Sequence, residues 1–116
     1  MAVIHNPSCA RLFGADALVE VAINGTVGSH LVAGQIDRCH IGADDIVIAD
    51  FKTGRPSDGP VPPTYCRQMA LYAALLGQIY PDRPITCWLV WTETASIQEI
   101  PEAARSEALR EMDGIG

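Results

Sequence analysis

The sequence lacks long hydrophobic runs, low-complexity tracts and internal repeats. No apolar stretch approaches the roughly 20 residues that a membrane-spanning helix needs, and the first residues lack the basic and then apolar pattern of a secretion signal. A chain of 116 residues is long enough for one hydrophobic core but too short for two domains of ordinary size. We therefore expect a soluble, cytoplasmic protein with no membrane partner, in which residues 1–116 form a single domain.

Closely spaced cysteines are also absent. The four cysteines lie far apart in the sequence, without the CxxC pair that would indicate zinc or an iron–sulfur cluster. We interpret them as buried free thiols. A packed core to hold them is expected, because 48% of the residues are apolar and 19% are charged, as in ordinary globular proteins.

Basic residues are few. Eight lysines and arginines face 14 aspartates and glutamates, which gives a net charge of −6. Because Lys and Arg supply most non-specific DNA affinity by neutralising phosphates, this balance counts against autonomous DNA binding. Half of the basic residues nevertheless fall within residues 38–67, and they could form a local basic rim on an acidic body: Arg38, Lys52, Arg55 and Arg67.

Three strands are predicted in the first half of the chain. Residues 18–23 (LVEVAI) are rich in β-forming side chains and are followed by a turn-like cluster at residues 24–28. Residues 30–38 resume an alternating apolar pattern. After a polar break at residues 42–45, residues 46–53 (IVIADFKT) form the strongest β-pattern of the sequence. We expect a hairpin followed by a third strand.

A helix is predicted over residues 64–80, where apolar side chains repeat at helical spacing without an interior proline. Thr64 is placed to cap its first turn. Pro81 and Pro84 end it, because proline cannot continue a helix. This helix is expected to cross over the sheet between the third strand and a fourth.

The remaining segments complete an α/β pattern. Residues 85–92 (ITCWLVWT) predict a buried strand, residues 97–100 a short edge strand, and Pro101 opens a final helix. The order is strand, strand, strand, helix, strand, strand, helix. The predicted fold class is therefore α/β, with a mixed β-sheet flanked by helices.

Asp50 and Lys52 form the centre of a predicted catalytic site. They are two positions apart on the third strand, so the pleat places a carboxylate and an ammonium on one face. An antiparallel pairing through the turn at residues 41–45 would bring Asp37 beside Asp50. Paired carboxylates repel each other unless they share a proton or a cation, and oxygen ligands suit Mg²⁺. This arrangement predicts phosphodiester hydrolysis, with Lys52 steadying the hydroxide or the charge that develops on phosphorus.

A simpler interpretation remains open for these three residues. Aspartate and lysine at strand ends often form weak surface ion pairs without any catalytic role. However, Lys52 is the only lysine of the chain, whereas there are seven arginines. Since the protein uses arginine for ordinary surface charge, a single lysine at this position favours a specific role.

Gln68 and Tyr72 lie four residues apart on the predicted helix, on the face that also carries Leu75 and Ile79. We expect that face to pack on the sheet. A buried amide and phenol need hydrogen-bond partners, which the carboxylates, Lys52 or a DNA phosphate could supply. The alternative for Tyr72 is an ordinary core aromatic residue.

The order and spacing of these motifs resemble the PD-(D/E)XK nuclease domains of AddA and RecB helicase–nucleases. The motifs are GQID (34–37), DFKT (50–53) and QMALY (68–72). The flanking segments resemble those of alphaproteobacterial AddA proteins, so the similarity covers nearly the whole chain: LFGADALVEV (12–21), YPDRPITCWLVWTE (80–93) and IQEIP (97–101).

The resemblance implies a restriction-endonuclease-like core and a Mg²⁺-dependent exonuclease, with Mn²⁺ as a possible substitute. The substrate would be single-stranded DNA ends in double-strand break repair and recombination, delivered by helicase motor domains in cis or on a partner subunit. The chain would then be a fragment of a larger helicase–nuclease. The resemblance assigns metal binding to Asp37, Asp50 and the Phe51 carbonyl, catalysis to Lys52, and orientation of the site or the DNA to Gln68 and Tyr72.

One feature of the family has no clear counterpart. Its members place a metal-binding histidine on a helix well upstream of the first strand, but His5 lies beside Asn6 and Pro7 rather than in a helical segment. We transfer this role neither to His5 nor to His30 or His40. Because Mg²⁺ keeps several waters readily, loss of one imidazole need not abolish metal binding, although it should weaken it. Glu20, on the first strand, is a further candidate for the site, with a solvated strand residue as the alternative.

Two other functions stay open at this point. A catalytically inactive nuclease-like module could bind DNA or pack on a motor, which the acidic balance and the missing histidine favour. An unrelated α/β domain with accidental motifs would place the paired carboxylates on separate faces of the sheet.

Overall fold

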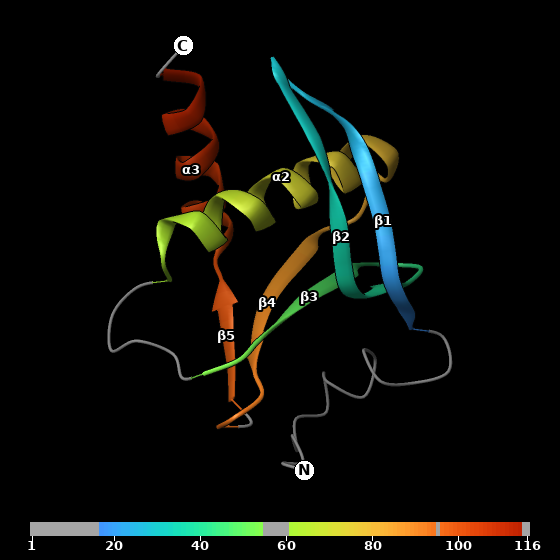
Figure 1. Ribbon diagram of the computed structural model, residues 1–116. Coiled ribbons are helices and arrows are strands. Elements are labelled where there is room, and N and C mark those ends of the chain that lie inside the picture. The colour runs from blue at the N-terminus through green and yellow to red at the C-terminus, as the bar shows by residue number, and fades with distance from the viewer. Residues whose placement is uncertain (1–16, 55–60, 95, 115–116) are drawn as a thin grey trace.

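A computed structural model describes residues 17–54, 61–94 and 96–114 of the chain. They form a mixed five-stranded sheet with two helices against it (Figure 1). The strands follow one another across the sheet in chain order, β1 to β5. The predicted α/β class is confirmed. Neither helix of the described part of the chain is long and apolar enough to cross a membrane.

The first three strands are β1 (Leu18–Val27), β2 (His30–Ile41) and β3 (Ile46–Lys52), each antiparallel to the next. The predicted turn at residues 24–28 is wrong, because β1 continues through it and the chain turns at Gly28, whose φ is 59°. Cross-strand pairing with β2 holds Asn24 and Gly25 in the ladder although both residue types favour turns, since β-propensity depends strongly on context.

The second half of the chain contains α2 (Pro63–Ile79), β4 (Ile85–Trp91), β5 (Ser96–Ile100) and α3 (Glu102–Gly114). As predicted, α2 crosses over between β3 and a parallel β4. The strand β5 then pairs antiparallel with β4 at the edge of the sheet.

The beginning of α2 differs from the prediction for Thr64. The cap residue is Pro62, and no side chain forms a capping hydrogen bond. Pro63 takes the first helical position, where its fixed φ suits the helix and its missing N–H costs nothing, so Thr64 lies inside the first turn. The other end agrees with the sequence, since Tyr80 closes the helix directly before Pro81.

The main core lies between the sheet and α2, and α3 packs against α2 (Figure 1). Its largest fully buried side chains include Ile36, Ile46, Ile48, Met69 and Leu89. A second, smaller cluster on the other face of the sheet joins Val47, Ala49, Trp88 and Val90. Since alternate residues of β3 and β4 enter different clusters, both strands are buried on both faces, as their nearly continuous apolar sequences predict.

Free thiols lie in this core. Cys39 and Cys87 are buried, and Cys66 is half-buried. Burial raises the pKa of Cys39 to about 11 and that of Cys87 to about 12. Both side chains therefore stay protonated and unreactive at neutral pH. The prediction of buried thiols is confirmed for these two; Cys9 lies outside the described residues.

The hairpin of β1 and β2 leaves the rest of the sheet at one point. Pairing between β2 and β3 ends at Arg38 and Ala49, whereas β2 continues to pair with β1 and β3 continues to pair with β4 (Figure 1). The next residues of the ladder would be Asp37 and Asp50. The two predicted carboxylates thus lie where the sheet divides.

Candidate active site

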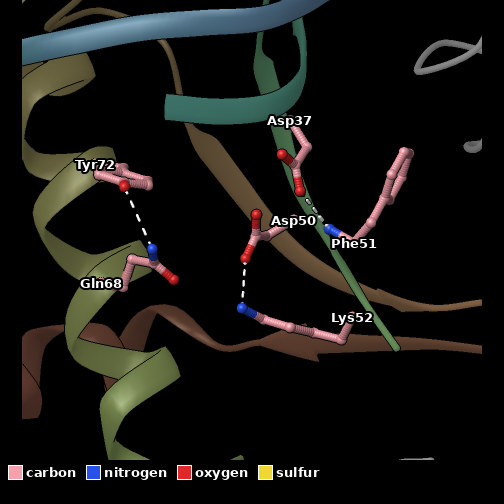
Figure 2. Close-up of polar contacts among 6 residues, drawn as sticks. All are labelled: Asp37, Asp50, Phe51, Lys52, Gln68 and Tyr72. Carbon is pink, nitrogen blue, oxygen red and sulfur yellow. Dashed lines mark hydrogen bonds and ion pairs between the residues drawn. The ribbon is translucent and has the colours of Figure 1, made fainter. Parts of the chain in front are cut away.

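The carboxyl end of β3 supplies an ion pair. Asp50 and Lys52 alternate with Phe51 along the strand, so both side chains lie on the sheet face that α2 covers (Figure 2). Lys52 Nζ lies 2.7 Å from Asp50 Oδ2. The pair is largely withdrawn from solvent, with the Asp50 residue 8% exposed and the Lys52 side chain 17% exposed. It is therefore not the exposed ion pair of the simpler interpretation.

Asp37 joins this pair from β2. Its Oδ2 accepts a hydrogen bond of 2.8 Å from the Phe51 backbone N–H. The β2–β3 ladder ends one residue earlier, so a side chain here satisfies a donor that the ladder no longer serves. In Figure 2 the Asp37 and Asp50 carboxylates face the same space, while the Phe51 ring points away. The convergence expected from counting through the turn is confirmed.

The two carboxylates are poorly compatible while both are charged. Burial raises the pKa of the Asp50 carboxyl, and a hydrogen bond with Asp37 raises it further. The Lys52 ammonium opposes this effect but does not outweigh it. A pair of this kind relaxes by sharing either a proton or a cation.

The donor set fits a hard divalent cation. Asp37 and Asp50 offer carboxylate oxygens, which Mg²⁺ prefers, and Mg²⁺ often binds through one or two carboxylates while it keeps several waters. Within residues 17–54, 61–94 and 96–114, no group of three His, Cys, Asp or Glu side chains converges on one point. In a site built on these two carboxylates, backbone oxygen, water and substrate could also bind the cation.

Gln68 and Tyr72 approach the carboxylates from α2. Gln68 Nε2 donates a hydrogen bond of 3.3 Å to Tyr72 Oη, and the Gln68 amide lies on the side of α2 that faces Asp50 and Lys52 (Figure 2). Tyr72 and Leu75 are buried as predicted. Ile79 is not, with 63% of its surface exposed. It is the last residue of α2, and the core cluster does not extend to it.

Gly34, in the GQID motif, sets the position of Tyr72. A Cβ atom there would overlap the Tyr72 hydroxyl and lie 2.9 Å from its Cζ atom. Glycine is thus required because the β1–β2 hairpin approaches α2 closely at this point. We expect Gly34→Ala to reduce the free energy of unfolding by about 1–3 kcal/mol, the usual cost of overpacking a core, and to separate Tyr72 from Gln68. Urea unfolding measures the first effect.

Gly77→Ala is the matched control. A Cβ atom at Gly77 would meet no side chain nearer than Ile85 Cδ1 at 4.0 Å. Since glycine inside a helix is less favourable than alanine by about 0.5–1 kcal/mol, this substitution should stabilise the protein. If Gly34→Ala unfolds at the urea concentration of the original protein, the close packing of Gly34 and Tyr72 does not contribute to stability.

In the β1–β2 register Glu20 lies opposite Asp37, but the two residues are not paired and the ladder is interrupted there. Pairing between β1 and β2 passes from Val19–Arg38 to Val21–Ile36. Glu20 has a φ of 53°, the only positive value among the described residues other than glycine. Its side chain is exposed, and it does not complete a three-group cluster with the two aspartates in the described part of the chain.

The histidines and the basic rim are not gathered at the site. His40 pairs with Val47, whose side chain lies in the cluster on the opposite face, and His30 lies at the far, hairpin end of β2. Arg38 also faces away from Lys52, with its guanidinium 5.9 Å from the centre of the Phe51 ring. The predicted rim is therefore divided between two faces. His5 and Arg55 lie outside the described residues.

Tyr65 is a site neighbour that the sequence analysis missed. Its ring centre lies 4.0 Å from Lys52 Nζ. One signal pointed to it, because Tyr65 lies three residues before Gln68 and seven before Tyr72, a spacing that places all three on one helix face.

Residues 6–113 match the family model described as the PD-(D/E)XK nuclease superfamily. Among solved structures, the crystal structure of SSO0001 aligns with a TM-score of 0.45 and 16% sequence identity, over 85% of this chain and 50% of that chain. The chain thus spans half the length of that protein. Curated proteins give no match. Because the family match covers nearly all of the sequence, this chain belongs to the PD-(D/E)XK nuclease superfamily.

Proposed function

We propose that the chain is a Mg²⁺-dependent deoxyribonuclease domain that hydrolyses phosphodiester bonds. The observation that carries this proposal is the meeting of Asp37, Asp50 and Lys52 at the point where the sheet divides. In a member of a nuclease superfamily, a carboxylate pair with an adjacent ammonium has the groups that phosphodiester hydrolysis needs.

Asp37 and Asp50 would hold the metal, together with the Phe51 carbonyl. Along a strand, the N–H and C=O of one residue point toward the same neighbouring strand. The Phe51 N–H points to Asp37, and the Lys52 carbonyl points the other way, accepting the Thr92 N–H at 3.0 Å. These directions support a Phe51 carbonyl on the Asp37 side. When bound, Mg²⁺ supplies a lowered pKa for water and a positive charge for the phosphoryl oxygen.

Lys52 would act on the reacting groups directly. Its ammonium can orient the attacking water by a hydrogen bond and stabilise the negative charge that builds up on phosphorus. Its contact with Asp50 keeps it beside the carboxylates before substrate binds. Gln68 and Tyr72, fixed to each other on α2, would orient the carboxylates or a DNA phosphate.

The biological context we propose is that of the AddA and RecB nuclease domains. The GQID, DFKT and QMALY motifs resemble theirs in order and spacing. We propose that the chain degrades single-stranded ends that a helicase motor delivers during double-strand break repair. The net charge of −6 supports a partner of this kind, because a strongly acidic domain gains from a motor that brings DNA to it.

A digestion assay tests the proposal. End-labelled linear and circular single-stranded DNA are incubated with the 116-residue chain at low salt, which offsets its acidic charge. Cleavage of the linear strand is expected with Mg²⁺ or Mn²⁺ and not with EDTA. Resistance of the circular strand would indicate attack from an end. Asp50→Ala should abolish the cleavage. Asp44→Ala, which makes the same charge change at an exposed position on the β2–β3 turn, should cleave at the original rate.

The second candidate is a nuclease-like module that binds DNA or a motor without cutting. Its support is the acidic charge and the two-carboxylate site, to which no third His, Cys, Asp or Glu is added in the described ranges. A folded chain that shows no cleavage with either metal, while it retards single-stranded DNA in a gel, would establish this candidate and contradict the first.

A further inference from the structure

The ammonium of Lys52 contacts both a carboxylate and an aromatic ring. Asp50 lies on one side at 2.7 Å, and the face of the Tyr65 ring lies on another, with its centre 4.0 Å away. This distance is well within the roughly 6 Å over which an aromatic face attracts a cation. The ring contact differs from the ion pair because a neutral ring does not compete for a metal.

Tyr65 is itself fixed by its neighbours. It lies in the first turn of α2, half-buried against the main core. Its ring packs on Trp91 with 6.3 Å between ring centres and 58° between ring planes. The Trp91 indole N–H in turn donates to Gln98 Oε1 on β5 at 3.1 Å. Trp91 is also the register partner of Lys52, so the lysine emerges directly beside this aromatic pair.

Lysine needs such a restraint more than most side chains. Its four-carbon stem is flexible, and its ammonium is a compact point charge with three rotatable donors. Lys52 is also the last residue of β3. If Asp50 binds a metal, the carboxylate is shared between two cations, and the ion pair alone fixes the lysine less firmly.

We propose that Tyr65 is a positioning residue for Lys52, whose ring face holds the amine beside the Asp37–Asp50 pair. Its catalytic consequence depends on the proposed nuclease function, whereas the contact itself does not. The ring is the active part, because the contact involves its face and not its hydroxyl. Tyr65→Phe should therefore preserve the position of Lys52, whereas Tyr65→Leu and Tyr65→Met should not.

The first test observes the contact without any cleavage. Because Lys52 is the only lysine, protein labelled with lysine that carries ¹³C at the ε position gives a single side-chain methylene signal. Protons above an aromatic face are shielded, so we expect this signal upfield of free lysine. Tyr65→Phe should keep the shift, and Tyr65→Leu should remove it. Tyr65→Met provides a second variant without a ring if the leucine variant does not fold.

The second test measures the consequence on single-stranded DNA with Mg²⁺. A cation–π contact of this kind corresponds to a loss of about tenfold in kcat for Tyr65→Leu, with KM nearly unchanged. Tyr65→Phe should restore the rate. Tyr80→Leu is the matched control, because Tyr80 is also half-buried on the core and contacts a cation, Arg83, at the far end of α2. It should alter neither the lysine signal nor kcat.

The outcomes separate this inference from the proposed function. If the original chain does not cut DNA but the lysine signal moves only in the ringless variants, Tyr65 positions Lys52 and the nuclease proposal is wrong. If the chain cuts DNA, and folded Tyr65→Leu keeps the signal or the kcat of the original, the inference is wrong. A rise in KM alone would also overturn it, since Tyr65 would then contact DNA instead.

Discussion

Asp50→Asn is expected to abolish Mg²⁺-dependent DNA cleavage and at the same time to stabilise the metal-free protein at neutral pH. Asparagine keeps the shape of the side chain but removes a carboxylate from the proposed metal site. Loss of a metal that contributes several kcal/mol to the transition state should lower kcat by about 1000-fold or more. The stability effect has the opposite direction, because the Asp50 carboxyl is buried beside a second carboxyl.

The sign follows from the pKa of Asp50, which burial and the Asp37 carboxyl raise in the folded protein. A raised folded pKa means that protonated Asp50 supports folding at acidic pH. That contribution is complete below the unfolded value of about 3.9 and is lost as the pH rises through the folded pKa. Asparagine cannot ionise. In EDTA, the melting temperature of Asp50→Asn should therefore rise relative to that of the original protein as the pH increases from 4 to 8.

Metal should reverse this order. A cation that binds only the folded state at 100 times its Kd stabilises it by about 2.7 kcal/mol. Added Mg²⁺ should raise the melting temperature of the original protein and have little effect on Asp50→Asn. Asp44→Asn, which makes the same charge change at an exposed position, should behave like the original in both solvents. A variant that melts lower than the original at pH 8 in EDTA would show that the Lys52 ion pair outweighs the burial of Asp50.

The carboxylate pair was predictable because β-structure has a fixed period. Residues 46–52 are apolar enough to define a buried strand, and the turn before them is closed by Gly42, whose N–H donates to Asp45 O at 2.8 Å. With Ile41 opposite Ile46, each further pair is determined by counting, so Asp37 reaches Asp50. On β3, the face that each side chain occupies follows from the same alternation.

Other features depend on geometry that no pattern encodes. The contact between Tyr65 and Lys52 requires the particular position of α2 over the sheet, and helix periodicity gives only the face on which Tyr65 lies. The positive φ of Glu20 is a distortion within a segment that is otherwise an ordinary strand. Thr64 failed as a cap because a neighbouring proline occupies the first helical position. Each case is settled by tertiary contacts or by competition between neighbours.

Lys52→Ala is expected to reduce kcat by about 100- to 1000-fold, the usual loss when one hydrogen-bond donor to the transition state is removed. Lys52→Arg should not restore the rate, since a planar guanidinium cannot take the place of a compact ammonium between Asp50 and Tyr65. The metal response distinguishes these variants from Asp50→Asn. Lys52 is a cation that competes with metal for Asp50, so its removal should leave Mg²⁺ binding intact or strengthen it.

Differential scanning fluorimetry with increasing Mg²⁺ checks this distinction. Without metal at neutral pH, Lys52→Ala should melt below the original protein, because Asp50 loses its counter-charge while it stays buried. Its rise in melting temperature with Mg²⁺ should equal or exceed that of the original. Arg110→Ala removes an exposed positive charge from α3 and should change neither kcat nor the metal response. If Lys52→Ala cuts DNA at the original rate, Lys52 has no part in the reaction; if it loses the response to Mg²⁺, its role is to build the metal site.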